Sequence, residues 1–321
     1  MKIGVIGCGR WGSFHAWYSS KIGHSVTLYG RETSKNMQQL LTTGGNDYLT
    51  LPEDVQLTTK LFDAVNFAKV IIISVSSQNF RELLREIKSL QIDLSEKKFV
   101  LCMKGLESGT GKRLSAVFDE EMNFSDTRVA VWVGPGHVQD FTKNIPNCMV
   151  MSSTDENFTH EVVEIFKSPL IRFYYSSDLI GTEIGAAAKN VIGIAAGMLD
   201  GFNCSSLKGA LMARATAELS RLVEALGGEK MTVYGLSHLG DYEATLFSRH
   251  SRNRKFGESF VTHKKFEKLA EGVETVAALK KLAEFTKVDL PICRAVYKII
   301  FEKQDPEDQL MELFLRSTKS E

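Results

Sequence analysis

A single lysine lies within a run of small residues between positions 181 and 195. The run reads Gly-Thr-Glu-Ile-Gly-Ala-Ala-Ala-Lys-Asn-Val-Ile-Gly-Ile-Ala, so that Lys189 is followed directly by Asn190. Such a run is typical of a packed helix interior, where a second backbone or a ligand can come close. Lysine is seldom buried there without a partner. Lys189 is therefore either a side chain that extends to solvent or a lysine that transfers a proton or binds substrate at a domain boundary.

A glycine motif near the N-terminus has the spacing of a phosphate-binding turn. Gly-Cys-Gly-Arg-Trp-Gly at 7–12 follows an apolar run and precedes a predicted helix over 13–22. In this context the pattern predicts dinucleotide binding, because Gly7 permits a tight turn, Gly9 lets a pyrophosphate approach, and Gly12 lets helix and strand pack. The helix N-terminus would offer N–H groups to the phosphates. The alternative is a glycine-rich turn that binds nothing.

The end of the second predicted strand, 25–29, bears on the choice of cofactor. Gly30 stands where NAD-selective folds carry an acid for the ribose hydroxyls, and Arg31 follows it. An arginine at this place can hold the 2′-phosphate of NADP(H). Glu32 comes about 20 residues after Gly12, within the usual range for the acid. The register favours acceptance of NADP(H), and NAD(H) remains the alternative.

Two later strand ends also carry candidate site residues. Lys104 follows a strand predicted over 99–103, and Gly134 follows a strand predicted over 129–133. Ligands of doubly wound sheets bind beyond the carboxyl ends of the strands. Lys104 is therefore a candidate site residue, and the alternative is a solvated loop lysine.

A predicted loop over 235–241 carries the acid Asp241, and a cationic segment follows it. Residues 249–255 read Arg-His-Ser-Arg-Asn-Arg-Lys, with four permanently charged cations. Such a run is usually a solvated face. Guanidinium groups beside Ser251 and Asn253 also suit a phosphate site, so Arg252, placed in a predicted loop that leads out of the Asp241 segment, is a candidate phosphate ligand.

Strands and helices alternate through the first half of the chain. Apolar runs predict strands over 2–6, 25–29, 70–75, 99–103, 129–133, 148–151 and 171–175, with helices over 13–22, 78–90 and 156–167. The alternation predicts an α/β class with a Rossmann-type doubly wound sheet. From residue 178 only helical periods follow, over 181–199, 206–226, 266–287 and 292–302. The predicted domains are a dinucleotide-binding domain, 1–177, and an all-α substrate and catalytic domain, 178–321.

Composition narrows the class of protein. The 321 residues include 39 Lys and Arg against 39 Asp and Glu, and zero net charge argues against a nucleic-acid binder. Five scattered cysteines without metal or redox spacing indicate reduced thiols in a cytoplasmic protein with no metal site. No apolar run approaches the roughly 18 residues of a membrane helix, and we expect no leader before the first strand.

In their order along the chain, these motifs resemble those of the sn-glycerol-3-phosphate dehydrogenases, and the bacterial NAD(P)-dependent branch is closest. The resemblance runs from Lys2 to about Glu274. Its motifs are Gly-x-Gly-x-Trp-Gly at 7–12, Lys-Gly-Leu-Glu at 104–107, Gly-Pro at 134–135, Lys-Asn at 189–190, Gly-Asp at 240–241 and Ser-Arg-Asn-Arg at 251–254. It implies reversible hydride transfer between NADP(H) or NAD(H) and dihydroxyacetone phosphate. The product, glycerol 3-phosphate, feeds phospholipid synthesis.

The resemblance also implies residue roles. Lys189 looks like the catalytic acid/base, with Lys104 and Asp241 as its neighbours around the substrate. Ser251, Arg252 and Asn253 look like the phosphate grip, with Arg252 also reaching the cofactor. The other implied substrate contacts are Gly134, Gly136, Asn190 and Thr245. The other implied cofactor contacts are Gly7, Gly9, Arg10, Trp11, Gly12, Arg31, Lys104, Val138 and Glu271.

Some positions depart from the family pattern. Val138 stands where Gly-Pro-x-x-Ala has its alanine, and Gly136 replaces a polar residue. The usual Gly-Leu-x-Gly-Leu-Gly-Asp-Leu reads Gly-Leu-Ser-His-Leu-Gly-Asp-Tyr at 235–242, so that His238 replaces a glycine beside the site. We expect these changes to alter local geometry more than the reaction class.

The chemistry points the same way independently of the resemblance. Hydride delivery to a ketone leaves a developing alkoxide, which needs a proton or a cation nearby. Lys189 can supply the proton; a second ammonium such as Lys104 would favour its release and Asp241 would oppose it. Two other functions remain open, a reductase of ketopantoate or hydroxyacid type and a non-enzymatic NADPH sensor. We expect a small-molecule substrate, homodimer formation, and neither nucleic acid nor a membrane span as partner.

Overall fold

Two compact units make up the chain. A computed structural model describes residues 1–123, 128–248, 250–267 and 269–318. The first unit comprises Met1–Lys104 and Leu114–Leu179, and the second comprises Gly105–Arg113 and Ile180–Glu321. The chain therefore leaves the first unit for one short segment before it returns.

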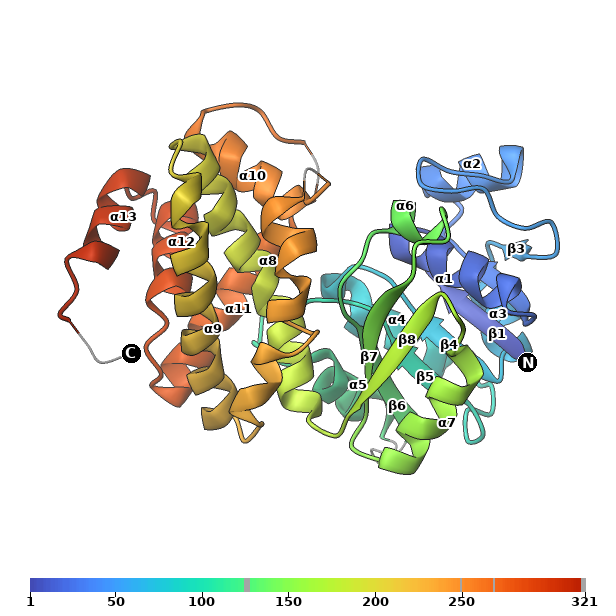
Figure 1. Cartoon of the computed structure of the whole chain (residues 1–321). Coiled ribbons are helices and arrows are strands. Elements are labelled where there is room, and N and C mark those ends of the chain that lie inside the picture. The colour runs from blue at the N-terminus through green and yellow to red at the C-terminus, as the bar shows by residue number, and fades with distance from the viewer. Residues whose placement is uncertain (124–127, 249, 268, 319–321) are drawn as a thin grey trace. The chain divides into compact units, whose positions relative to one another are not determined.

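The strands of the first unit form one eight-stranded sheet in the order β3-β2-β1-β4-β5-β6-β7-β8 (Figure 1). The strands are β1 (Lys2–Ile6), β2 (Ser25–Tyr29), β3 (Gln56–Thr58), β4 (Val70–Ile73), β5 (Lys98–Leu101), β6 (Val129–Val133), β7 (Asn147–Ser152) and β8 (Ile171–Ser176). Neighbouring strands are parallel except β6 and β7, which pair antiparallel. The order reverses at β1, which pairs with both β2 and β4, and ligands of such sheets bind outside this point.

The central strands are apolar because both faces of the sheet are covered. Every residue of β4 and β6 is buried, as the sequences Val-Ile-Ile-Ile and Val-Ala-Val-Trp-Val predict for strands between two layers of helices. The helices of this unit are α1 (Arg10–Lys21), α2 (Lys35–Thr43), α3 (Leu61–Phe67), α4 (Phe80–Ser89), α5 (Leu114–Met122), α6 (Val138–Phe141) and α7 (Glu156–Phe166). The predicted α/β class is confirmed.

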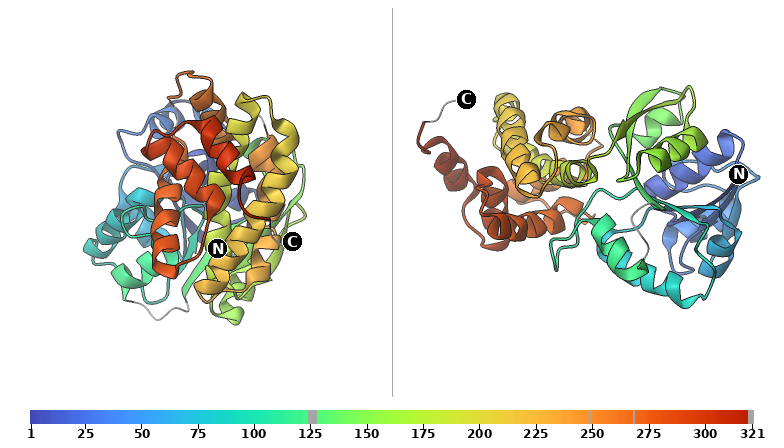
Figure 2. Two further views of the ribbon diagram at one scale, coloured as in Figure 1. Left: turned by 90° about the vertical axis from the view of Figure 1, so that its left-hand side faces the viewer. Right: turned by 90° about the horizontal axis from the view of Figure 1, so that it is seen from below.

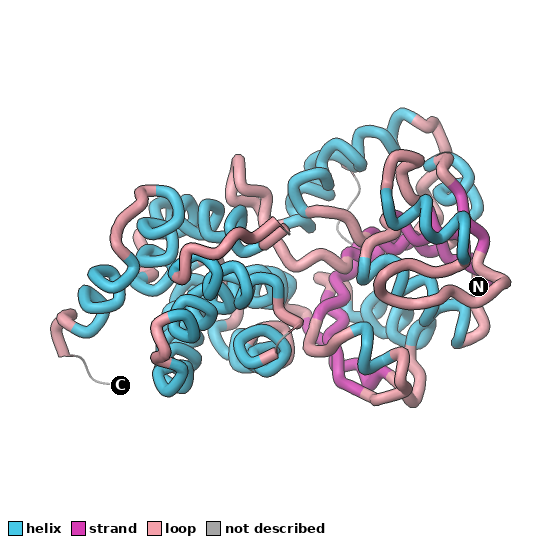
Figure 3. Tube along the Cα trace, turned by 90° about the horizontal axis from the view of Figure 1, so that it is seen from above, coloured by secondary structure: helices cyan, strands magenta, loops and turns pink. Residues whose placement is uncertain are grey.

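Among the described residues of the second unit, the regular elements are all helices, joined by loops (Figures 2 and 3). Its helices are α8 (Leu179–Gly201), α9 (Lys208–Ala225), α10 (Arg252–Val261), α11 (Glu271–Thr286), α12 (Pro291–Phe301) and α13 (Pro306–Phe314). Among the described helices, α8 alone is long and apolar enough to cross a membrane, but 89% of its most apolar window is buried inside the protein. It has the burial of a core helix.

Glycines bring α8 and α10 into backbone contact. A Cβ at Gly197 would lie 1.8 Å from the main-chain oxygen of Arg254, and a Cβ at Gly257 would lie 2.0 Å from that of Ile194. Only residues without a side chain fit at these two positions. This close packing accounts for the glycines at these two positions, because each helix backbone occupies the space that a side chain on the other would need.

Some predicted boundaries were wrong. The helix predicted over 13–22 begins at Arg10, and the one predicted over 266–287 begins at Glu271. Arg252 does not lie in a loop, because α10 starts there.

The segment 105–113 belongs to the second unit for identifiable reasons. Leu106 is completely buried in the second hydrophobic core, and the Arg113 guanidinium donates to the Glu183 carboxylate of α8 at 2.7 Å. The sequence pattern gave no sign of these contacts. The domain limits 1–177 and 178–321 remain a prediction, and the compact units differ from them in this segment.

Candidate active site

The glycine turn after β1 has the geometry that a pyrophosphate needs. Gly7 has φ of +110°, and a Cβ at Gly12 would lie 1.7 Å from the Gly7 oxygen. A Cβ at Gly9 would have no described atom within 4 Å, so that the backbone is open on that side. The described first turn of α1 contains no acidic side chain that would repel an anion. The turn therefore fits the pyrophosphate of a dinucleotide, to which the N-terminus of α1 would offer N–H groups.

Two cationic candidates lie near this turn. The Arg10 guanidinium lies 5.1 Å from the centroid of the Tyr48 ring. Arg31 and Glu32 both follow β2 and are exposed. Both side chains are therefore accessible to a cofactor, Arg31 to a 2′-phosphate and Glu32 to ribose hydroxyls. Which of the two contacts the cofactor stays a prediction.

Lys104 is held beside the same turn. Its ammonium donates to the Gly134 carbonyl at 2.6 Å and lies 5.4 Å from the centroid of the Trp11 ring. The lysine is half-buried, unlike a freely solvated loop lysine. The structure thus brings together three predicted site residues from the ends of β1, β5 and β6. Lys104 belongs to the first unit, and its position next to Lys189 stays a prediction.

The residues after β6 explain one departure from the family motif. Gly134 and Gly136 have φ of +139° and +134°, and a Cβ at Gly136 would lie 2.6 Å from the Phe141 ring. A polar residue at 136 would therefore collide with Phe141. Val138 is completely buried in the first core, and its contact with a cofactor stays a prediction.

A buried, neutral histidine lies near Trp11, with the two ring centroids 6.0 Å apart. His15 is 1% exposed, and burial, with a smaller contribution from the Lys104 charge, lowers the pKa of His15 to about 3. The ring therefore adds no positive charge to this side of the site at neutral pH.

Lys189 is buried and ion-paired within the second unit. It is 5% exposed, and its ammonium forms a salt bridge with Asp241, which is 1% exposed. The ammonium also donates to the Thr245 hydroxyl at 3.0 Å, and that hydroxyl donates to the main-chain oxygen of Asp241 at 2.7 Å. The interpretation of Lys189 as a solvent-exposed side chain is wrong.

The backbone around Thr245 is unusual. Residues Glu243–Phe247 form a π-helical turn, a conformation often found at functional sites. Within this turn Thr245 is buried and faces Lys189.

A histidine and a tyrosine flank Asp241 in the chain. His238 contacts the Gly185 carbonyl through Nδ1 at 2.8 Å and the Tyr242 hydroxyl through Nε2 at 2.6 Å. Because a carbonyl can only accept, Nδ1 carries the proton and Nε2 accepts from the tyrosine. Burial lowers the pKa of His238 to about 4, so the ring is neutral at pH 7.

The predicted phosphate-binding residues lie at the start of α10. Ser251 caps the helix, its Oγ accepting from the Arg254 N–H at 3.3 Å, and Arg252 is the first helical residue. The Asn253 side chain accepts from the Gly272 N–H at 3.0 Å, next to Glu271 at the start of α11.

Asn190 lies beside this junction of α10 and α11. It is 6% exposed, and a Cβ at Gly272 would lie 2.7 Å from its main-chain oxygen. The packing thus groups Asn190, Asn253 and Gly272 next to the helix that carries Lys189.

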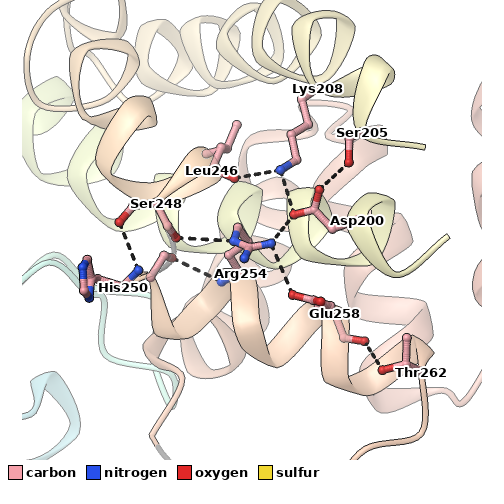
Figure 4. A network of polar contacts seen from close by, with 10 residues as sticks. Asp200, Ser205, Lys208, Leu246, Ser248, His250, Arg254, Glu258 and Thr262 are labelled. Carbon is pink, nitrogen blue, oxygen red and sulfur yellow. Dashed lines mark hydrogen bonds and ion pairs between the residues drawn. The ribbon is translucent and has the colours of Figure 1, made fainter. Parts of the chain in front are cut away.

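The cationic segment 249–255 divides into different environments. Arg249 lies outside the described residues. Arg254 belongs to a network with Asp200 and Glu258, and Lys208 donates to the same Asp200 carboxylate at 2.7 Å (Figure 4). Burial alone would raise the pKa of Asp200, but hydrogen bonds from Lys208, Ser205 and Arg254 lower it. Sequence analysis did not identify this network, because a lone acid at the end of a helix carries no motif.

No metal site emerges from the part of the chain that the structure describes: none of its His, Cys, Asp or Glu side chains form a group of three or more that could hold an ion.

Taken together, the reversed strand order, the open glycine turn and the buried lysine–aspartate pair define a dinucleotide-dependent oxidoreductase with a helical second unit. A model described as NAD-dependent glycerol-3-phosphate dehydrogenase N-terminus matches residues 2–159, and the corresponding C-terminus model matches residues 178–311. The chain belongs to the NAD-dependent glycerol-3-phosphate dehydrogenase family, which confirms the resemblance and the nicotinamide cofactor expected from it.

Individual relatives agree over the whole length. Glycerol-3-phosphate dehydrogenase [NAD(P)+] from Pelodictyon phaeoclathratiforme is 36% identical over 333 residues, covering 100% of this chain and 99% of the relative. The enzyme of that name from Chlorobium phaeobacteroides is 37% identical over 336 residues with the same coverage. The crystal structure of glycerol-3-phosphate dehydrogenase from Coxiella burnetii superposes with a TM-score of 0.90 at 28% identity, covering 98% of this chain and 99% of that one.

Proposed function

We propose that the protein catalyses the reversible NAD(P)H-dependent reduction of dihydroxyacetone phosphate to sn-glycerol 3-phosphate, the precursor of glycerophospholipids. The observation that carries the proposal is the buried Lys189–Asp241 pair with Thr245, in a chain of this family. Lysine is rarely buried so completely unless its charge is used or paired.

Lys189 supplies the proton in this proposal. When a ketone receives a hydride, negative charge develops on its oxygen, and a nearby ammonium can stabilise that charge and then protonate it. Asp241 and Thr245 hold the ammonium in one place through a salt bridge and a 3.0 Å hydrogen bond. Fixed geometry is itself catalytic, because the donor needs no reorganisation as the charge develops.

The start of α10 binds the substrate phosphate. Ser251 uses its oxygen as an acceptor for the helix cap, which leaves its O–H proton to donate. Arg252 adds a planar, permanently charged donor group, and helix N-termini favour anions. Asn253 fixes the neighbouring start of α11 through its bond to Gly272. The phosphate is then a remote handle whose binding energy orients the carbonyl.

The first unit binds the cofactor. The nicotinamide supplies the hydride when it is bound. Gly7, Gly9 and Gly12 leave room for the pyrophosphate, and the exposed Arg31 binds the 2′-phosphate of NADP(H). Lys104, held by Gly134 beside Trp11, contacts cofactor and substrate.

The proposal extends to location and assembly. All five cysteines are free thiols, which supports a reducing, cytoplasmic location. Large exposed apolar side chains on the second unit, Phe285 at 81%, Phe314 at 62% and Leu315 at 80%, support a homodimer that covers some of them. Sedimentation of the purified protein measures the second point.

One assay tests the activity. NADPH and NADH oxidation is followed with dihydroxyacetone phosphate, ketopantoate and oxaloacetate, and glycerol 3-phosphate is tested in reverse. We expect turnover only with the phosphorylated substrates. Faster turnover of ketopantoate or oxaloacetate would assign another reductase activity, and cofactor binding without turnover would indicate a sensor.

A further inference from the structure

A hydrogen-bonded pair connects the segment that carries Asp241 to the helix that carries Lys189. His238 and Tyr242 are both 0% exposed. The His238 Nδ1–H donates to the Gly185 carbonyl of α8 at 2.8 Å, and the Tyr242 O–H donates to His238 Nε2 at 2.6 Å. The Thr216 hydroxyl also interacts with Tyr242.

The contact point on α8 is one turn before the lysine. Gly185 and Lys189 are four residues apart, so they lie one above the other on the same helix face. A Cβ at Gly185 would lie 3.0 Å from the His238 Cβ, so the histidine backbone approaches α8 closely. Tyr242 is the residue after Asp241. The two bonds therefore fix Asp241 from both sides of the chain.

We propose that His238 and Tyr242 are positioning residues that hold the Asp241 carboxylate against the Lys189 ammonium and act as a unit. The inference rests on the proposed role of Lys189. Each of the two residues thus provides a hydrogen-bonding partner for the other.

The cost of an unpaired buried polar group explains why His238 and Tyr242 should act together. Removing one member leaves a buried polar group of the other member without that partner, whereas removing both can be nearly neutral. Tyr242→Leu leaves His238 Nε2 without its donor. His238→Gly removes the contact with Gly185 and leaves a cavity beside Asp241. The double variant His238→Gly/Tyr242→Leu places an apolar pair there.

The test measures kcat and KM for dihydroxyacetone phosphate, direct cofactor affinity by nicotinamide fluorescence, and Tm. We expect His238→Gly to lower kcat about tenfold or more and Tyr242→Phe to lower it several-fold, since each loses a buried hydrogen bond. Cofactor affinity changes less than twofold in each. His238→Asn, whose amide can still donate to Gly185, recovers more kcat than His238→Gly. The double variant is more active than His238→Gly.

The outcomes separate this inference from the proposed function. If the unmutated parent does not turn over dihydroxyacetone phosphate, the proposed function is contradicted. A parent that turns over, with variants whose Tm falls but whose kcat is unchanged well below Tm, contradicts positioning. Equal activity of His238→Asn and His238→Gly contradicts the role of the Gly185 contact.

A second inference comes from the first unit. The position after β2 cannot carry a side chain, because a Cβ at Gly30 would lie 2.4 Å from Cys8 Sγ, 3.1 Å from Cys8 Cβ and 2.9 Å from Met37 Sδ. Cys8 is 5% exposed, and its thiol lies 3.4 Å from the Ser34 hydroxyl at the start of α2.

We infer that Cys8 is a specificity-determining residue, because its thiol occupies the space that an acid at position 30 would need. An acid there would bind the ribose hydroxyls and repel a 2′-phosphate. Cys8 therefore keeps position 30 without a side chain, and hence without a carboxylate, directly before Arg31. The inference rests on the proposed cofactor role of this turn.

A double-mutant cycle tests the inference through binding rather than turnover. Dissociation constants for NADH and NADPH and the Tm are measured for Gly30→Asp in the parent and in a Cys8→Ala background. We expect Gly30→Asp alone to lower Tm and weaken both cofactors. In the Cys8→Ala background, the protein with Gly30→Asp should bind NADH at least tenfold better than NADPH and regain part of the lost Tm.

Cys8→Val is the matched control, because valine keeps the obstruction, and Gly30→Asp should remain damaging in that background. The same effect of Gly30→Asp in the parent and Cys8→Ala backgrounds overturns the inference. A parent that binds neither nucleotide instead contradicts the proposed cofactor site.

Discussion

Lys189 and Asp241 form an ion pair in which the lysine side chain is 7% exposed and the aspartate side chain 1% exposed. Water contributes little to the solvation of either charge, so each depends on the other. Removing one partner of such a pair commonly costs about 3–5 kcal/mol, because the other charge is left buried. Loss of activity and loss of stability must therefore be separated in every variant of this pair.

Lys189→Ala should abolish most turnover. A general acid is worth about 10²- to 10⁴-fold, and we expect kcat to fall by that factor while cofactor affinity stays within twofold. The companion double variant Lys189→Met/Asp241→Leu should regain Tm but no activity, since it removes both charges. Turnover of the purified single variant within threefold of the parent would contradict the role of Lys189 as the acid.

Arg31→Ala should discriminate between the two cofactors. Only NADPH carries the 2′-phosphate, so its Michaelis constant should rise about tenfold or more while that for NADH changes little. Initial rates with each cofactor at saturating dihydroxyacetone phosphate give both constants. Equal effects on the two would make Arg31 a surface residue and Glu32 the ribose contact.

Arg252→Lys should impair use of the substrate phosphate. The loss of a charge-assisted bond of about 1.5–3 kcal/mol predicts a fall in kcat/KM for dihydroxyacetone phosphate of roughly 10- to 150-fold. The slow rate with unphosphorylated dihydroxyacetone should barely change, and added phosphite should stimulate that rate in the parent more than in the variant. Damage to both substrates alike would place Arg252 in the cofactor site or the fold.

Gly197→Ala should destabilise the second unit. The new Cβ would meet the Arg254 main-chain oxygen at 1.8 Å, so α8 and α10 must separate, and we expect a loss of about 1–3 kcal/mol measured by urea unfolding. Gly209→Ala is the matched control. It lies in α9 with no described atom within 4 Å of a new Cβ and should be neutral or stabilising. Similar losses in both variants would show that helix packing is not the cause.

Glu218 should make stability depend on pH. It is buried on α9, where its carboxylate accepts the N–H groups of Ile292 and Cys293 at 2.9 and 3.1 Å, and desolvation raises the pKa of Glu218 to about 7. The folded state then binds more protons than the unfolded state between about pH 4.5 and 7. The stability contribution is therefore full below that window and is lost as pH rises through it.

Comparison of the parent with Glu218→Gln isolates this effect, because the buried neutral histidines are the same in both proteins. The free energy of unfolding of the parent should fall more steeply between pH 5 and 7.5 than that of the variant. Parallel pH profiles would contradict the shifted carboxyl.

The sequence predicts every strand of the sheet except β3, because most of the other strands are short apolar runs that alternate with helical segments. The runs at 70–75 and 129–133 correspond to β4 and β6, and the motif at 7–12 lies at the predicted turn. Continuous apolar runs and local turn chemistry are properties of neighbouring residues. They can therefore be recognised without knowledge of the rest of the fold.

Contacts between distant segments could not be predicted in this way. The small-residue run suggested that something approaches α8, but not that α10 is the neighbour through Gly197 and Gly257. Asp241 could be linked to Lys189 only through the family resemblance, because 52 residues separate them. The tie between His238 and Gly185 depends on side-chain packing and carries no sequence signal of its own.

The segment 105–113 limits how this chain can be divided or recombined. A fragment that begins at residue 178 would lack Leu106, which is buried in the second core, and Arg113, which pairs with Glu183. It would expose a hydrophobic surface and leave that glutamate without this arginine. A chimera joined to a relative at the same point would receive 105–113 from one parent and the surface it packs against from the other. The two units are thus distinct in space but not modular along the gene.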